Sequence, residues 1–245
     1  MDVQAINKIE ALVRDGMTVD VDGRKYSASS LRPVYYVPRT ETVEVHSLRG
    51  FCGFISNDID KTITGSPHLI VVTSPILVEI ISAAWGDDKE RSVSVSAVLG
   101  KGLDVFPFCT FMSQEEFAIR FRSLFVAKKG DDFDYVAQYA SKLVGGMNVE
   151  GADDGVTQRV AVRRGICESR TDKMELKAIV KLSPYRTFRD VEQPESEFLL
   201  RVRMDSNGMP TVALFEADGG AWRDKAMANI VEYIERQVPG IPVIA

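Results

Sequence analysis

The apolar positions of this chain switch between helical and extended spacing along its length. In residues 3–14 they recur every three or four positions, which predicts an amphipathic helix. Residues 17–21 and 24–27 are extended runs joined by Asp22-Gly23, and Asp-Gly between two such runs is typical of a tight hairpin. The chain is therefore expected to begin with a helix followed by a hairpin.

A helix and several neighbouring strands are expected next. Residues 42–46 alternate as a short strand, and Ser47 is well placed to cap a helix that has a broad apolar face. Three runs rich in β-branched or alternating residues then predict the strands of a meander, in residues 68–73, 76–82 and 91–99.

Two helices are predicted in the middle of the chain. Ser113 and Glu116 have the spacing of a capping box and precede apolar residues at helical intervals. Asp132 begins a second helix, which is expected to end at Gly145-Gly146.

The C-terminal part repeats the order of strands followed by a helix. The last helix is expected over residues 220–238, where Trp222, Ala226, Ile230 and Ile234 form one apolar face, so we expect it to pack against a core. Four antiparallel strands are expected before it, in residues 156–162, 174–182, 198–204 and 211–215.

These elements predict an α+β fold, with antiparallel sheets, flanking amphipathic helices and a long C-terminal helix. Residues 145–155 contain four glycines and are the best candidate for a hinge. We therefore expect an N-terminal α+β region over residues 1–145, then a C-terminal sheet and helix over residues 146–245. The two regions form either separate subdomains or one continuous domain.

Charge, cysteine spacing and the length of apolar stretches limit the classes of protein that fit this sequence. The 245 residues carry a formal charge of −5, which argues against a protein that coats nucleic acid with its whole surface. Cys52, Cys109 and Cys167 are far apart and predict free thiols in a reducing compartment. No apolar stretch is long enough to span a bilayer, and the N-terminus lacks the features of a signal peptide. A cytoplasmic protein without membrane contact is expected.

The familiar catalytic motifs are missing from the sequence. There is no Walker phosphate loop, no GxSxG elbow and no HExxH zinc motif. His46 and His68 are the two histidines, and their spacing from the cysteines supports no metal site, so no cofactor is expected. The aspartates in residues 58–60, 131–134 and 153–154 are explained as helix starts or turns, unless they converge on a metal in the fold. A binding protein is thus favoured over an enzyme.

Basic residues are unevenly distributed. Residues 156–203 contain eleven Lys or Arg and seven Asp or Glu, and residues 117–129 contain four cations without an acid. Local clusters of this kind can hold phosphates, and nearby aromatic rings can stack on bases. The alternative is a solvated surface with cross-strand ion pairs. The candidate nucleic-acid-binding residues are Arg120, Arg122, Lys128, Lys129, Arg159, Arg163 and Arg164.

Five segments resemble the prophage-encoded YfdQ-like family in their order and pattern. They are residues 69–75 (LIVVTSP), 182–188 (LSPYRTF), 198–203 (FLLRVR), 213–216 (ALFE) and 239–243 (PGIPV). The similarity extends over about residues 65–245. It implies a phage or prophage gene expressed in a bacterial host cell, and it assigns no functional residue.

Three functions are consistent with these observations. The first is a phage accessory protein that acts by binding, as a homo-oligomer, in DNA metabolism or host counter-defence, with a host or phage protein as a further partner. The second is a single-stranded nucleic-acid-binding or annealing accessory. The third is a metal-dependent phosphodiesterase or nucleotide hydrolase. The apolar tail at residues 241–244 is expected to contact a second copy of the chain.

Overall fold

The computed structural model describes residues 3–27, 40–86, 89–100, 105–142, 158–163 and 171–245. The chain divides into two units, Met1–Glu41 and Thr42–Ala245. Runs of strands are separated by single helices along it, and the expected α+β class is confirmed.

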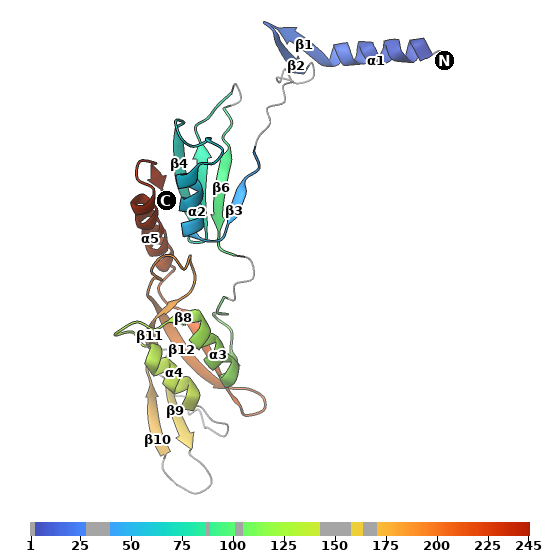
Figure 1. Ribbon diagram of the computed structural model, residues 1–245. Coiled ribbons are helices and arrows are strands. Elements are labelled where there is room, and N and C mark those ends of the chain that lie inside the picture. The colour runs from blue at the N-terminus through green and yellow to red at the C-terminus, as the bar shows by residue number, and fades with distance from the viewer. Residues whose placement is uncertain (1–2, 28–39, 87–88, 101–104, 143–157, 164–170) are drawn as a thin grey trace. The chain divides into compact units, whose positions relative to one another are not determined.

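The N-terminal unit consists of helix α1 (Val3–Met17) and a hairpin of β1 (Thr18–Val21) and β2 (Arg24–Ser27) (Figure 1). Asp22 and Gly23 connect the two strands with positive φ angles of 53° and 76°. A two-residue turn of this kind needs positive φ at both positions, which Asp and Gly tolerate. The predicted helix and hairpin are both confirmed.

The larger unit contains two five-stranded sheets. The first sheet and its helices consist of β3 (Val43–Val45), α2 (Leu48–Asn57), β4 (His68–Ser74), β5 (Leu77–Ser82), β6 (Val93–Val98), α5 (Trp222–Gln237) and β14 (Val243–Ile244). Its strand order is β14-β4-β5-β6-β3, and helices α2 and α5 lie beside it (Figure 1). Side chains of α2 and α5 share one core with the three central strands. The central strands form the expected antiparallel meander, while the two edge strands pair in parallel.

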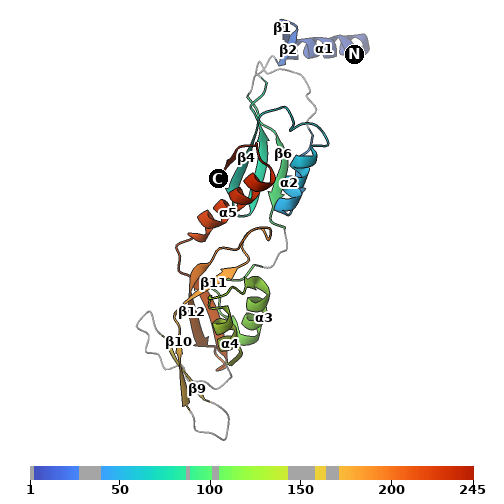
Figure 2. The same cartoon turned by 60° about the vertical axis from the view of Figure 1, so that its left-hand side comes forward.

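The second sheet is covered by two helices on one face. Its elements are β7 (Met112–Ser113), α3 (Gln114–Leu124), β8 (Phe125–Val126), α4 (Phe133–Lys142), β11 (Ile179–Pro184), β12 (Ser196–Met204) and β13 (Pro210–Glu216). The strand order is β7-β13-β12-β11-β8, and every pair is antiparallel. Figure 2 shows α3 and α4 on the same side of β11 and β12.

A separate two-stranded ribbon precedes β11. It consists of β9 (Gln158–Arg163) and β10 (Thr171–Leu176). The single strand predicted over residues 174–182 is therefore wrong, because the chain changes partners between Leu176 and Ile179. The apolar alternation continues through this break, so the pattern alone does not reveal it.

Two predicted helix starts are confirmed by their caps. The hydroxyl of Ser47 accepts a hydrogen bond from the N–H of Gly50 at 3.0 Å, at the start of α2. The hydroxyl of Ser113 accepts one from the N–H of Glu116 at 3.3 Å, at the start of α3. Such side chains satisfy N–H groups that have no partner within the helix.

Each of the two five-stranded sheets has its own hydrophobic core. The core of the second sheet is rich in aromatic rings, with Phe121 of α3 stacked on Phe117, Phe125 and Phe133 at centroid distances of 4.6–5.6 Å. The core of the first sheet joins the apolar faces of α2 and α5 to the central strands. The hydrophobic stripes seen in the sequence are thus buried on both sheets.

The boundary predicted between residues 145 and 146 lies outside the described residues. Both sheets combine strands from the two sides of it: β7 and β8 pair with β13 and β11, and β14 pairs with β4.

The apolar C-terminal tail is part of the chain's own first sheet. Val243 lies opposite Ile70 in β4, and the carbonyl of Pro242 accepts a hydrogen bond from the N–H of Ile70 at 2.9 Å. Contact of the tail with a second copy stays a prediction, since β14 is an edge strand of this sheet. Helix α5 brings the tail back beside β4, a long-range crossover that local sequence does not encode.

Candidate functional site

The connection between β11 and β12 joins the two sheets. Gln193 holds this loop closed: its side-chain oxygen accepts from the N–H groups of Arg186 and Thr187, and its side-chain nitrogen donates to the carbonyl of Phe188 at 2.9 Å. Thr187 donates to the carbonyl of Pro75 beside β5. The loop is thus bonded to the first sheet while its ends continue the second.

Arg186 is the most deeply buried charge described in this loop, with 7% of the residue exposed. Its guanidinium forms an ion pair with Glu216 and donates to the hydroxyl of Ser196. Burial lowers the pKa of Arg186 to about 10, while the carboxylates of Glu216 and Asp218 oppose that shift. The arginine stays charged at neutral pH, and its partners hold the ends of β12 and β13 together.

Trp222, the first residue of α5, covers this arginine. The guanidinium carbon of Arg186 lies 4.0 Å from the centre of the indole ring. The expected burial of Ala226, Ile230 and Ile234 is confirmed, but Trp222 is half-buried and packs over the guanidinium. The predicted apolar face therefore begins one turn later than expected.

Lys128, one of the predicted nucleic-acid-binding residues, points into the same loop. Its Nζ donates to the carboxylate of Glu192 at 2.7 Å and to the carbonyl of Gln193 at 2.6 Å. The hydrogen bond and charge of Lys128 lower the pKa of Glu192. The geometry indicates that Lys128 anchors the loop.

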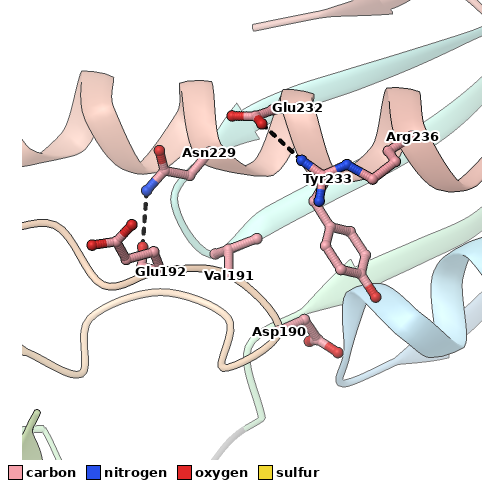
Figure 3. Close-up of a pocket in the computed structure, with 7 residues that line it drawn as sticks. All are labelled: Asp190, Val191, Glu192, Asn229, Glu232, Tyr233 and Arg236. Atoms are coloured by element: carbon pink, nitrogen blue, oxygen red, sulfur yellow. Dashed lines mark hydrogen bonds and ion pairs between the residues drawn. The ribbon is translucent and has the colours of Figure 1, made fainter.

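A surface pocket of about 250 Å³ lies between this loop and α5 (Figure 3). Most of its polar side chains have partners in the protein. Asp190 accepts from the N–H of Leu48 at the start of α2, Glu232 pairs with Arg236, and Asn229 donates to the carbonyl of Glu192. These residues line the pocket together with Val191 and Tyr233. The lining is therefore explained by helix capping and by contacts that hold the loop on α5.

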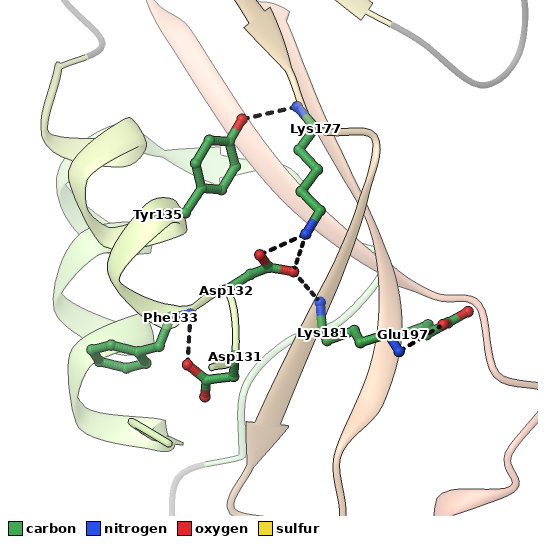
Figure 4. Close-up of polar contacts among 7 residues, drawn as sticks. All are labelled: Asp131, Asp132, Phe133, Tyr135, Lys177, Lys181 and Glu197. Atoms are coloured by element: carbon green, nitrogen blue, oxygen red, sulfur yellow. Dashed lines mark hydrogen bonds and ion pairs between the residues drawn. The ribbon is translucent and has the colours of Figure 1, made fainter. Parts of the chain in front are cut away.

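Asp132 joins α4 to the second sheet (Figure 4). Its carboxylate accepts from Lys177 Nζ at 2.7 and 2.8 Å and from the N–H of Lys181 at 2.8 Å. The hydroxyl of Tyr135 accepts from the N–H of Lys177, and Asp131 accepts from the N–H of Phe133. The interpretation of these acids as a helix start is confirmed, because both carboxylates bind N–H groups or cations of the protein.

The other predicted basic residues that the structure describes come from several elements. Arg120 pairs with Glu116 on α3, and Arg122, two positions further, lies on a different side of that helix. Lys129 is exposed beyond the end of β8. Arg159 and Arg163 belong to β9. Arg164 lies outside the described residues.

The residues considered for metal binding or catalysis have structural roles where they are described. The side chain of Asp58 accepts from the N–H groups of Thr62, Ile63 and Thr64. A hydrogen bond from the side chain of Thr64 lowers the pKa of Asp58 most, and the three N–H groups lower it further. His46 and His68 each contact a backbone carbonyl. In the part of the chain that the structure describes, no three metal-binding side chains come together.

The two cysteines among the described residues differ in burial. Burial, together with the charge of Asp190, raises the pKa of Cys52 to about 11, which keeps it protonated. Cys109 is exposed, at a positive φ of 60°. Cys167 and the acidic pair Asp153-Asp154 lie outside the described residues.

One face of α1 in the N-terminal unit exposes apolar side chains to solvent. Its six apolar side chains are 40–67% exposed. They recur at helical spacing along the whole helix, so they form a continuous stripe. The residues of this α1 stripe are Val3, Ile6, Ile9, Leu12, Val13 and Met17.

Comparisons with protein-family models, curated proteins and solved structures found no match for this chain. Among the helices of the described residues, none is long and apolar enough to cross a membrane.

Proposed function

We propose that this protein acts by binding, as a homo-oligomer assembled through α1, and that it is a phage-encoded accessory protein of DNA metabolism or host counter-defence. The exposed α1 stripe is the observation that supports binding. The phage setting rests on the resemblance of about residues 65–245 to the YfdQ-like family.

The α1 stripe needs a partner for energetic reasons. An isolated helix of 15 residues is marginally stable in water, so most helices depend on packing of their apolar face. Exposed apolar patches rimmed by polar residues are typical of interaction sites. We therefore infer that α1 buries its stripe in an assembly.

A second copy of α1 fits this stripe better than a lipid surface does. The helix sequence contains two basic residues, Lys8 and Arg14, and two acidic residues, Glu10 and Asp15. Helices that lie on anionic membranes are rich in Lys and Arg on the polar face, whereas this helix is balanced. In a two-fold dimer, the same apolar face meets itself, and mixed charges at its rim can pair.

The test is a charge placed in the centre of the stripe. Ile9 is 53% exposed, so Ile9→Glu should leave residues 42–245 folded while it makes burial of the stripe unfavourable. We expect the wild type to have a mass above the 27.2 kDa monomer by light scattering at micromolar concentration, and Ile9→Glu to shift it toward that value.

Lys8→Glu is the matched control, because it introduces a carboxylate at the neighbouring position, away from the stripe. It should leave the oligomer in place. A wild type that remains monomeric across this concentration range would contradict the proposal, as would equal dissociation by both variants.

A further inference from the structure

The second sheet has one face turned away from its core. Side chains of β11, β12 and β13 alternate between the two faces, as in any strand. Val180, Leu200 and Leu214 belong to the core under α3 and α4. Their neighbours in sequence therefore lie on the opposite face, which we call the outer face. No member of either core cluster of described residues belongs to it.

Strand register places aromatic and basic residues close together on this outer face. Arg201 pairs with Ala213, and Arg203 pairs with Thr211 on the neighbouring strand. The guanidinium carbon of Arg203 lies 3.9 Å from the centre of the Phe111 ring. The rings of Phe111 and Phe215 are 5.9 Å apart at an angle of 65°.

The outer face carries net positive charge and is exposed in part, since Ser183 and Ala213 on it are buried. Phe111 and Phe215 are both half-buried, so part of each ring faces solvent, and Arg203 is exposed. Lys181 is also exposed on β11, opposite Glu197 with an Nζ–Oε1 distance of 3.7 Å. Three cations, Lys181, Arg201 and Arg203, thus accompany one acid in a chain whose overall charge is −5.

We propose that the outer face of the second sheet binds single-stranded nucleic acid. A flat sheet with exposed aromatic rings can stack on unpaired bases, and the cations beside the rings can contact the phosphates. In a duplex the bases are already stacked and paired, so the rings have no base faces to contact. The ligand is therefore a single strand, held with little sequence preference.

This site differs from the cluster predicted from the sequence, and it does not use α1. Arg201 and Arg203 stand at alternate positions of one strand, separated from Phe111 by about 90 residues of chain. They approach Phe111 only because β7 and β12 flank β13 in the sheet.

The experiment measures binding of fluorescein-labelled oligothymidylate and oligouridylate. Each strand is about 20 nucleotides long, which is more than one single-strand-binding domain usually covers. Fluorescence anisotropy at low salt should show binding of at least one of these strands, and weaker binding of a duplex of equal length. Raising the salt should weaken binding with a slope of about −2 in log affinity against log salt if three phosphates are contacted.

Two variants test the site independently. Phe111→Leu with Phe215→Leu removes the rings but keeps apolar side chains, and should weaken binding about tenfold or more. Lys181→Glu with Arg203→Glu reverses two charges at exposed positions, and should abolish measurable binding at moderate salt. Circular dichroism melts of both variants show whether they are folded, and the charge variant remains informative if the aromatic one unfolds.

The control is Lys61→Glu, an exposed charge reversal in the connection between α2 and β4 of the first sheet. It should retain wild-type affinity. Lack of binding by the wild type at low salt, preference for the duplex, or an equal loss with Lys61→Glu would each overturn the proposal. Because these assays do not depend on α1, Ile9→Glu separates a failure here from a failure of self-association.

Discussion

Replacing Arg186 by methionine is expected to lower the free energy of unfolding by about 2–4 kcal/mol, since removal of one partner from a buried ion pair leaves the other partner uncompensated. The guanidinium of Arg186 lies 5.4 Å from the centre of the Phe198 ring and 4.0 Å from that of Trp222. Methionine keeps much of the apolar volume but loses the contacts to Glu216 and Ser196. Urea unfolding followed by tryptophan fluorescence measures the effect, because Trp222 covers this site.

Arg189→Met is the matched control for this variant. Arg189 lies in the same loop, but it is exposed and its guanidinium only stacks on Tyr185 at 4.6 Å. A contact of this kind contributes at most about 1 kcal/mol at an exposed site. If both variants unfold at the same urea concentration, Arg186 does not have the stabilising role that its burial indicates.

Phe121→Ala is expected to destabilise the protein by about 3–5 kcal/mol, the usual cost of removing a fully buried phenylalanine. Phe121 has no exposed surface and stacks on three other rings in the core of the second sheet. Alanine would leave a cavity among Phe117, Phe125 and Phe133, because rings held in a packed core relax only in part. Chemical unfolding monitored by circular dichroism reports the change.

Ile119→Ala, two positions away on the same helix, provides the comparison. Ile119 is 63% exposed, so its truncation should change the free energy of unfolding by about 0.5 kcal/mol or less. A loss from Ile119→Ala as large as that from Phe121→Ala would mean that α3 packs through a different face.

Most helices and strands were predictable from the sequence because their signals are local. Ser47 and Ser113 cap helices through N–H groups only three residues away. Asp22-Gly23 forms its turn through the φ angles of two residues. Amphipathic spacing also indicated the stripe of α1, since a helix places every third or fourth side chain on one face.

The candidate sites could not be predicted from local sequence signals. Lys128, a predicted nucleic-acid-binding residue, binds Glu192 and Gln193, more than 60 residues further along the chain. The apolar tail, which we predicted to contact a second copy, pairs with β4 of its own chain. Both outcomes depend on which distant segments become neighbours, and charge or hydrophobicity along the chain does not specify the partner.

The outer face of the second sheet also depends partly on local sequence and partly on long-range strand pairing. Arg201 and Arg203 alternate with Leu200, Val202 and Met204 in the sequence, so strand alternation alone places the two arginines on one face. The position of Phe111 beside Arg203 follows instead from the strand order β7-β13-β12. Local periodicity thus determines which side of an element is polar, whereas long-range strand pairing determines which polar and aromatic residues form a common surface.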